Sequence, residues 1–207
     1  MKSKKFWNGH AAQYDTGVMK RYSDAYRRTI ELAKSNLKPT DRVFDFGCGT
    51  GLVTNEIAGS VGSIVAVDLS EKMLEIAKHK AAERGITNVV FETCGSEPLP
   101  ASSDTYDVLC AFNVLYFIRD LDALLARFHA MLKPGGVFLS VTDCVGRPKD
   151  FKTRVIFLLM KLGVFPFIRF MSTQDLVASV EKAGFEVLHK ENLFTDPPNY
   201  YVAAKKK

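Results

Sequence analysis

The sequence predicts an α/β protein built on a doubly wound, mostly parallel sheet with helices on both faces. Short apolar runs alternate along the chain with segments whose apolar residues recur at helical spacing, a pattern typical of parallel strands joined by right-handed crossovers. Residues 106–112 are almost entirely apolar, as expected of a strand buried on both faces. Residues 43–46 are followed by three alternating glycines, which indicates a strand that turns tightly into a helix.

The other elements follow in chain order from the same signals. Ser70 is expected to cap a helix, because its hydroxyl can accept hydrogen bonds from amides of the first turn. Gly85 and Gly184 are expected to end helices, and the last two strands are close enough in sequence to form a hairpin. Helices are expected at residues 27–37, from 52 onward, between 70 and 85, and at 121–132 and 173–183, and strands at 43–46, 64–67, 88–91, 106–112, 137–141, 185–189 and 200–203.

The glycine-rich loop at residues 47–51 indicates a place where the backbone passes close to a ligand. Glycine adopts positive φ and has no Cβ to obstruct a bound group, and free amides at the start of a helix face anionic or polar groups. The loop lacks the Lys-Ser/Thr pair of a P-loop, and Leu52 stands where a dinucleotide fingerprint needs glycine. A ligand with a carboxylate or a ribose therefore fits better than a pyrophosphate, and an ordinary glycine-rich turn is the alternative.

Length and charge limit the domain organisation and the partners. A chain of 207 residues suits one well-cored domain, so we expect a single domain over 1–207 with an N-terminal cap at about 1–37 and a lid at about 146–171. The net charge is +5, but without the six tail lysines the body carries about −1. Nucleic-acid binding needs positive charge clustered within the fold, so no nucleic-acid partner is expected. The tail lysines are Lys2, Lys4, Lys5, Lys205, Lys206 and Lys207.

The four cysteines bear on metal binding and on the cellular compartment. Their spacing is not typical of metal ligands, so no metal site is expected, and no leading segment has the form of a signal peptide. We therefore expect Cys48, Cys94, Cys110 and Cys144 to be reduced thiols of a cytoplasmic protein.

Four motifs in order resemble those of the class I S-adenosylmethionine-dependent methyltransferases. They are residues 45–51 (Asp-Phe-Gly-Cys-Gly-Thr-Gly), 67–70 (Val-Asp-Leu-Ser), 106–108 (Tyr-Asp-Val) and 132–136 (Leu-Lys-Pro-Gly-Gly). The resemblance extends over most of the chain. It implies a Rossmann-like, seven-stranded sheet whose last strand is antiparallel, S-adenosylmethionine as cofactor, and in-line transfer of its methyl group to a small-molecule acceptor.

The expected cofactor site lies just beyond the carboxyl ends of the strands, where open α/β sheets bind ligands. Asp68 can accept hydrogen bonds from both hydroxyls of an adenosine ribose, and a helix-capping acid is the alternative. The resemblance places Asn113 beside the methionine part of the cofactor. The expected cofactor-binding residues are Tyr14, Asp45, Gly47, Cys48, Gly49, Gly51, Asp68, Leu69, Met73, Gly95, Ser96, Glu97, Asn113 and Tyr116.

The adenine contact departs from the family pattern. Related sequences often have an Asp that meets the adenine amine, and this chain has Gly95 there. Either Ser96 or a backbone carbonyl replaces that contact, or adenine is held less specifically. At the sulfonium, the rings of Tyr14, Tyr116 and Phe117 could attract the positive charge, with plain core packing as the alternative.

Two residues are candidates for a general base, and neither is essential to the chemistry. Asp143 follows the fifth strand, where the acceptor should approach, and a capping role is the alternative. His10 is the second candidate among the four histidines. A base is needed only when the acceptor must lose a proton early.

Residues 151–171 form an unusually apolar segment that is too broken to span a membrane. Gly163 and Pro166 interrupt it, and the stretch from 143 to 169 carries a net charge of about +4. We expect a lid that walls a hydrophobic, possibly lipid-like acceptor, with at most weak peripheral contact with a membrane. A purely structural cover is the alternative for this segment. For the whole chain, the alternatives are a nicotinamide-dependent reductase and a non-catalytic S-adenosylmethionine-binding module.

Overall fold

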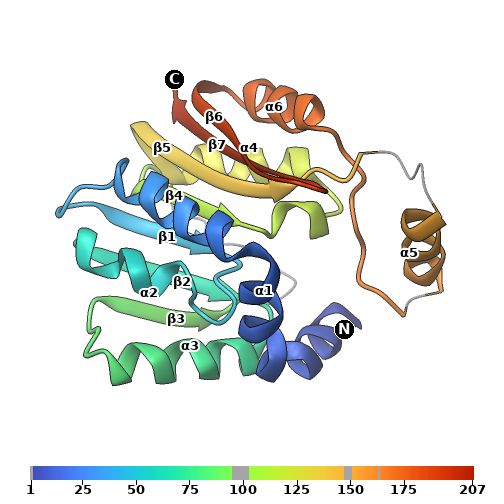
Figure 1. Cartoon of the computed structure of the whole chain (residues 1–207). Coiled ribbons are helices and arrows are strands. Elements are labelled where there is room, and N and C mark those ends of the chain that lie inside the picture. The colour runs from blue at the N-terminus through green and yellow to red at the C-terminus, as the bar shows by residue number, and fades with distance from the viewer. Residues whose placement is uncertain (1, 95–102, 147–150, 163) are drawn as a thin grey trace.

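The computed structural model describes residues 2–94, 103–146, 151–162 and 164–207. Within these residues seven strands form one sheet in the order β3-β2-β1-β4-β5-β7-β6 (Figure 1). The strands are β1 (Arg42–Phe46), β2 (Ser63–Asp68), β3 (Val89–Thr93), β4 (Tyr106–Phe112), β5 (Leu132–Asp143), β6 (Phe185–Thr195) and β7 (Pro198–Lys206). The helices are α1 (Lys2–Lys34), α2 (Thr54–Ile57), α3 (Glu71–Glu83), α4 (Leu121–Met131), α5 (Phe151–Lys161) and α6 (Thr173–Lys182), with 3₁₀ turns η1 (Ala58–Ser60) and η2 (Leu115–Phe117).

The sheet confirms the predicted doubly wound, mostly parallel arrangement. Strands β3, β2, β1, β4 and β5 run parallel, and β7 lies antiparallel between β5 and β6. The chain moves outward from β1 to β3 and then crosses back to place β4 on the other side of β1. This reversal of strand order opens a crevice beyond the carboxyl ends of β1 and β4, the usual ligand site of such sheets.

The sheet separates two hydrophobic cores. Because side chains alternate along a strand, Val43 packs with α1, α2 and α3 on one face, while Phe44 packs with α4 and α6 on the other (Figure 1). On β4 the same alternation assigns Val108 to the first core and Leu109 to the second. Both faces of the central strands are therefore buried, which explains their nearly continuous apolar sequence.

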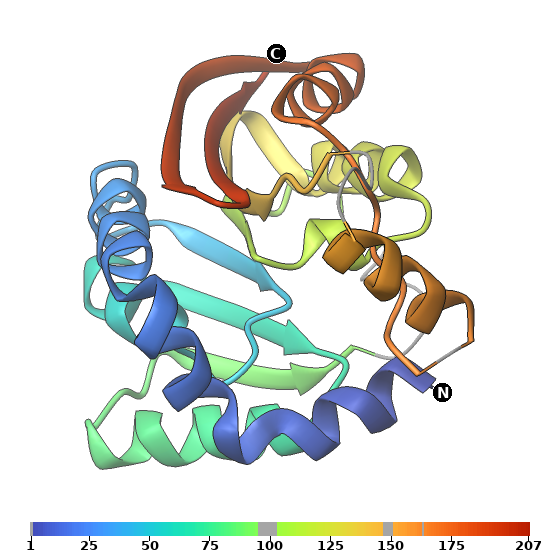
Figure 2. The same ribbon diagram turned by 45° about the vertical axis from the view of Figure 1, so that its right-hand side comes forward.

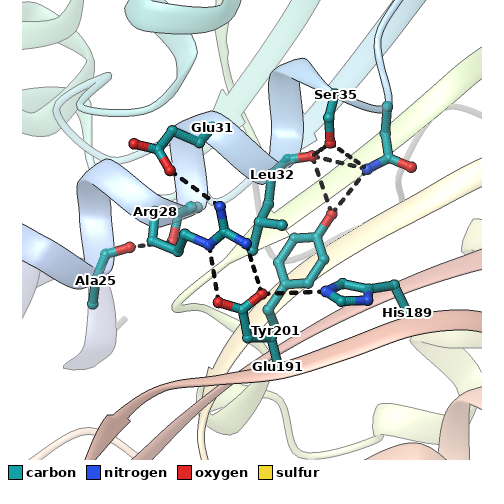
Figure 3. Close-up of polar contacts among 10 residues, drawn as sticks. Ala25, Arg28, Glu31, Leu32, Ser35, His189, Glu191 and Tyr201 are labelled. Atoms are coloured by element: carbon teal, nitrogen blue, oxygen red, sulfur yellow. Dashed lines mark hydrogen bonds and ion pairs between the residues drawn. The ribbon is translucent and has the colours of Figure 1, made fainter.

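The C-terminal half of α1 is fastened to the antiparallel edge of the sheet by packing and by polar contacts (Figure 3). The Arg28 guanidinium donates to both carboxylate oxygens of Glu191 on β6, at 2.9 and 3.0 Å. Beneath this pair the fully buried ring of Tyr201 packs in the core, and its hydroxyl donates to the Leu32 carbonyl at 3.4 Å. The contacts tie a helix near the N-terminus to the last strand of the chain.

Helix α1 is much longer than the helix expected at residues 27–37, and that prediction was wrong at both ends. It runs from Lys2 to Lys34, with a break in helical geometry at Tyr22 (φ −120°, ψ 18°). The N-terminal half meets loops through separate aromatic and polar side chains rather than through a continuous apolar stripe. For that reason its sequence lacks the periodicity by which amphipathic helices are recognised.

Other boundaries differ for similar reasons. The helix expected from residue 52 is only one turn, Thr54–Ile57, followed by η1. Strand β5 starts at Leu132 rather than 137, because Leu132 pairs with Tyr106 before a register shift. Strands β6 and β7 extend well past their apolar runs because they pair as a long hairpin. The Ser70 cap is confirmed, since its hydroxyl accepts from the Met73 amide at 3.2 Å.

Helix α5 stands beside the main body, near the N-terminal end of α1 (Figure 2). The Phe165 ring after α5 contacts the Phe6 ring of α1, with centroids 5.2 Å apart. Leu158 and Leu162 remain 56% and 64% exposed. No helix in the described ranges is both long and apolar enough to cross a bilayer.

We predict that packing of Tyr201, more than the ion pair beside it, holds α1 on the sheet. Tyr201→Ala should lower the free energy of unfolding by about 3–5 kcal/mol, as removal of a buried aromatic ring usually does. Arg28→Ala should cost less, because the exposed Arg28–Glu191 pair is solvated. Denaturant unfolding of both variants measures the difference, and an equal or larger loss for Arg28→Ala would contradict the prediction.

Candidate functional site

A cavity of about 360 Å³ lies beyond the carboxyl ends of β1, β2 and β4. Its volume is in the range that holds small-molecule ligands. Seven of the residues expected from the sequence line this cavity, and a smaller recess of about 30 Å³ adjoins it and contains Asp45 and Cys48. The seven are Tyr14, Gly47, Gly49, Asp68, Leu69, Met73 and Asn113.

The three glycines of the loop after β1 have different roles. All take positive φ, +74° at Gly47, +56° at Gly49 and +74° at Gly51. A Cβ on Gly47 would lie 2.5 Å from a methyl of Val114, and one on Gly51 would lie 2.9 Å from the Asn55 amide nitrogen. A Cβ on Gly49 would meet no atom within 4 Å. Gly47 and Gly51 thus serve close packing, whereas Gly49 faces the cavity.

Asp68 ends β2 and joins its loop to the glycine loop. Its Oδ2 accepts from the Gly49 amide at 2.9 Å, and its Oδ1 accepts from the Ser70 amide at 2.8 Å. Burial raises the pKa of Asp68, and hydrogen bonds from the backbone amides of Ser70, Gly49 and Leu69 oppose that rise. A carboxylate has about four acceptor sites, so Asp68 still offers the cavity a fixed acceptor.

Asp45 lies deeper, at the base of the smaller recess. It is 2% exposed and accepts a hydrogen bond from the Thr54 hydroxyl at 2.6 Å. Burial, with a lesser contribution from the charge of Asp68, raises the pKa of Asp45 to about 7. Because a buried carboxylate is costly without a counter-charge, this position favours a cationic ligand group.

The N-terminal half of α1 lies against the cavity, where the sequence had pointed to Tyr14 but not to Trp7 or Asp15. Trp7 and Tyr14 line the cavity from this helix. Asp15 anchors the helix to the glycine loop and to α3, accepting from the Thr50 hydroxyl at 2.5 Å and from the Lys80 amine at 2.8 Å. The aromatic residues at 6–14 were the only signal in the sequence, and they carry no information about which loop they meet.

The aromatic residues after β4 only partly fulfil the expectation for a sulfonium site. Phe117 lines the cavity, and its ring lies edge-on to Trp7 with centroids 5.0 Å apart. Tyr116 packs against Phe117 at 4.2 Å behind the lining, and burial raises its pKa well above the usual value. Tyr14 lies on the other side of Trp7, at 6.1 Å.

The two candidate bases are not brought to the cavity lining. Asp143 lies at the end of β5 and accepts from the Asn199 amide at 2.7 Å, and burial raises its pKa. His10 is exposed on α1, where its Nδ1 lies 2.7 Å from the Phe6 carbonyl and its ring stacks on the Phe6 ring. Asn199, which the sequence did not single out, bonds both Asp143 and Asn113.

Some expected features lie elsewhere or outside the described residues. Gly95, Ser96 and Glu97 fall outside them, so the departure from the adenine pattern stays a prediction. Gly51 does not line the cavity. Among the described residues no group of His, Cys, Asp and Glu side chains is arranged to hold a metal. No disulfide joins the four cysteines, all of which lie in the described ranges.

Comparison with known proteins places this site in a family. The family model described as a methyltransferase domain matches residues 18–190. The chain is 31% identical over 151 residues to a ubiquinone/menaquinone biosynthesis C-methyltransferase of Teredinibacter turnerae, covering 71% of this chain and 59% of that protein. It is 25% identical to a ubiquinone biosynthesis O-methyltransferase of Leptothrix cholodnii, covering 80% and 77%.

A solved structure agrees on the fold. Geranyl diphosphate C-methyltransferase from Streptomyces coelicolor, solved with Mg²⁺, geranyl diphosphate and S-adenosyl-L-homocysteine, matches with a TM-score of 0.74 at 16% identity, covering 94% of this chain and 84% of that one. The family match extends over most of the chain, and it includes the glycine loop and the carboxylate after β2. The chain therefore belongs to the class I S-adenosylmethionine-dependent methyltransferases, the family that its four motifs predicted.

Proposed function

We propose that the protein transfers a methyl group from S-adenosylmethionine to a small, mostly apolar acceptor. The observation that carries the proposal is the pairing of an open glycine position with a fixed carboxylate, Gly49 and Asp68, at the reversal of strand order. Family membership and the relatives named above support the same activity. The chain spans only 59% of the C-methyltransferase relative, so its substrate is argued from the site itself.

The ribose, the ammonium and the sulfonium of the cofactor each have a matching partner in the site. The Asp68 oxygens suit the two ribose hydroxyls, and the Gly49 backbone suits close approach of the ligand. Asp45 suits the ammonium of the methionine part, and Asn113 lies near the same end. The ring of Tyr14 offers an aromatic face to the sulfonium, an attraction worth about 0.5–2 kcal/mol.

The proposed chemistry depends on orientation more than on proton transfer. The cofactor supplies a methyl group on a positively charged sulfur, which leaves as a neutral thioether when the acceptor's lone pair attacks. The cavity walls hold the two reactants in line, and such positioning contributes on the order of 7–11 kcal/mol in favourable cases. The roles of Asp143 and His10 as bases stay predictions, since neither lines the cavity.

The acceptor side of the cavity is apolar. Trp7, Phe117, Ile118 and Pro166 line it together, and Pro166 belongs to the segment that follows α5. We propose that this segment, within the lid of about 146–171, and the cap of about 1–37 enclose the acceptor. The exposed leucines of α5 and the positive charge of its segment fit weak peripheral contact with a membrane.

The first prediction concerns cofactor binding. Gly49→Ala should weaken binding of S-adenosylhomocysteine by roughly tenfold or more, because its methyl group would enter the cavity where the ligand meets the backbone. Gly85→Ala is the matched control, since Gly85 also has positive φ and its Cβ would also meet no atom within 4 Å, but it follows the end of α3 and does not line the cavity. Calorimetry with S-adenosylhomocysteine and with NADPH measures both. Equal affinity for the two variants would contradict the site, and binding of NADPH alone would favour a reductase.

The second prediction concerns pH. The pKa of Asp45 rises from 3.8 to about 7 on folding, so the folded state holds a proton that the unfolded state releases. The free energy of unfolding should therefore fall as pH rises from about 4 to 7, and Asp45→Asn should flatten that part of the profile. A ligand ammonium beside Asp45 favours the charged carboxylate, so cofactor binding at pH 6 should release a proton from the parent but not from the variant. Calorimetry in two buffers of different ionisation enthalpy measures this release.

The third prediction concerns the acceptor. In a panel of phenols, quinol-like compounds, fatty acids, amines and amino acids, methylation should be confined to the apolar members. Radiolabelled methyl transfer measures activity. If the only acceptors found are polar, the apolar wall is a structural cover.

The proposed membrane contact has a test of its own. Flotation with anionic vesicles should show weak binding that salt reduces, and absence of flotation would remove the membrane contact alone.

A further inference from the structure

The proposal starts from a chain of buried and half-buried polar groups that runs from the cavity to the antiparallel strand β7. Asn199 on β7 is 3% exposed, and its amide nitrogen lies 2.8 Å from Asn113 Oδ1 and 2.7 Å from Asp143 Oδ1. The antiparallel register places Asn199 directly opposite Asp143, so the two side chains share one face of the sheet. Asn113 lines the cavity, whereas Asp143 and Asn199 lie behind it.

The Asp143 carboxylate determines the orientation of two side-chain amides, those of Asn199 and Asn113. An ionised carboxylate only accepts hydrogen bonds, so the Asn199 atom that faces Asp143 must be its amide nitrogen. The second hydrogen of the same nitrogen then faces Asn113, which must present its carbonyl oxygen. The remaining end of the Asn113 amide hydrogen-bonds the Tyr26 hydroxyl.

Asn113 has little freedom to escape this constraint. It holds a left-handed backbone conformation, φ +55°, that few residues adopt. Its backbone N–H donates to the Val141 carbonyl at 2.7 Å. The Tyr26 hydroxyl lies 3.4 Å from the Tyr14 hydroxyl, and Tyr14 also lines the cavity. The orientation set at Asp143 therefore reaches two residues of the cavity wall.

We propose that Asn199 is a positioning residue. Because it donates to the Asp143 carboxylate and to Asn113 at once, it holds the Asn113 side-chain amide in one orientation and so fixes the hydrogen-bond donors that a bound cofactor meets. This inference rests on the proposed function only for the identity of the ligand. It gives Asp143 a role that does not require it to reach the acceptor.

The groups around Asp143 determine the pH range in which its carboxylate stays ionised and the two amides keep this orientation. Burial raises the pKa of Asp143, while the Asn199 amide and the charge of Arg21 lower it. Protonation of Asp143 would turn an acceptor into a donor and release both amides, so affinity in the parent should weaken as pH falls. The groups that face Asp143 are Arg21, Tyr22 and Tyr26 on α1, Tyr116 on η2, Cys144 beyond β5 and Asn199 on β7.

Asn199→Asp tests the proposal because stability and affinity should respond differently to pH. At pH 8 two carboxylates would face each other, and S-adenosylhomocysteine should bind about 10- to 100-fold more weakly. As pH falls towards 5.5 one carboxyl gains a proton and donates it to the other, so the melting temperature should recover relative to the control. A carboxyl has one hydrogen where the amide nitrogen has two, so none is left for Asn113 and affinity should stay low. The matched control is Asn192→Asp, the same change at an exposed position of β6. Affinity equal to that of this control at every pH would overturn the proposal.

A double variant separates positioning from stability. In Asp143→Asn/Asn199→Asp the pair is restored with donor and acceptor exchanged, so the melting temperature should return to that of the control. The carboxylate now at position 199 can only accept, so Asn113 must turn its amide over, and affinity should stay roughly tenfold low. Recovery of stability and affinity together would show that Asn199 is merely structural.

A ligand-free measurement distinguishes this inference from the proposed function. If the parent binds no S-adenosylhomocysteine, the proposed function fails, and the side-chain amide resonances of Asn113 still report its orientation. Tyr26→Phe should shift the Asn113 NH₂ signals in the parent, where they face the Tyr26 hydroxyl, but not in the double variant. The same shift in both proteins would overturn the inference.

Discussion

The hydrogen bond from the Gly49 amide to Asp68 is the constraint on which the site depends. It joins the loop after β1 to the loop after β2 at 2.9 Å, and so turns two flexible connections into one rigid wall. Gly49 makes this bond at φ +56°, and the second oxygen of Asp68 is held by the Ser70 amide at the start of α3. Backbone amides, rather than a second side chain, therefore fix the carboxylate where it lines the cavity.

Helix α1 closes this wall with two different kinds of attachment. Its C-terminal half is held by buried contacts such as Tyr201 against Leu32, which yield large and non-directional stabilisation. Its N-terminal half is held by part-buried polar bonds, in which the Ser70 hydroxyl donates to Asn8 Oδ1 at 2.6 Å and the Lys80 amine donates to Asp15 at 2.8 Å. Aromatic contacts such as that of Trp7 with Phe117 add to these bonds. The break in helical geometry at Tyr22 separates the two halves of the helix.

The fold was predictable because its signals are local, and part of the site was predictable for the same reason. Glycine spacing, an acid at a strand end and apolar runs all lie within a few residues, and these local signals pointed to Gly49 and Asp68, which line the cavity. Asn199 and Trp7 could not be found this way, because their roles depend on which distant segment packs beside them. Asn199 meets Asp143 because β7 pairs with β5 in the register that places the two residues opposite each other. The sequence around Asn199 does not indicate that pairing. Asp143 was singled out as a candidate base at the end of the fifth strand, but sequence alone could not tell that the Asn199 amide stands between it and Asn113 of the cavity wall.

The charge distribution around the cavity accounts for the kind of ligand it suits. Asp45, Asp68 and Asp143 are all held in surroundings whose burial raises their pKa, and the cost of burying such groups grows when they lie near one another. Two of them are partly compensated by backbone or side-chain donors, whereas Asp45 has a single hydroxyl donor, Thr54. A neutral ligand would leave that cost in place. A ligand with a permanent positive charge and an ammonium group offsets it on binding, so the electrostatics favour a sulfonium cofactor over its neutral product and make release of the product easier after the methyl group has left.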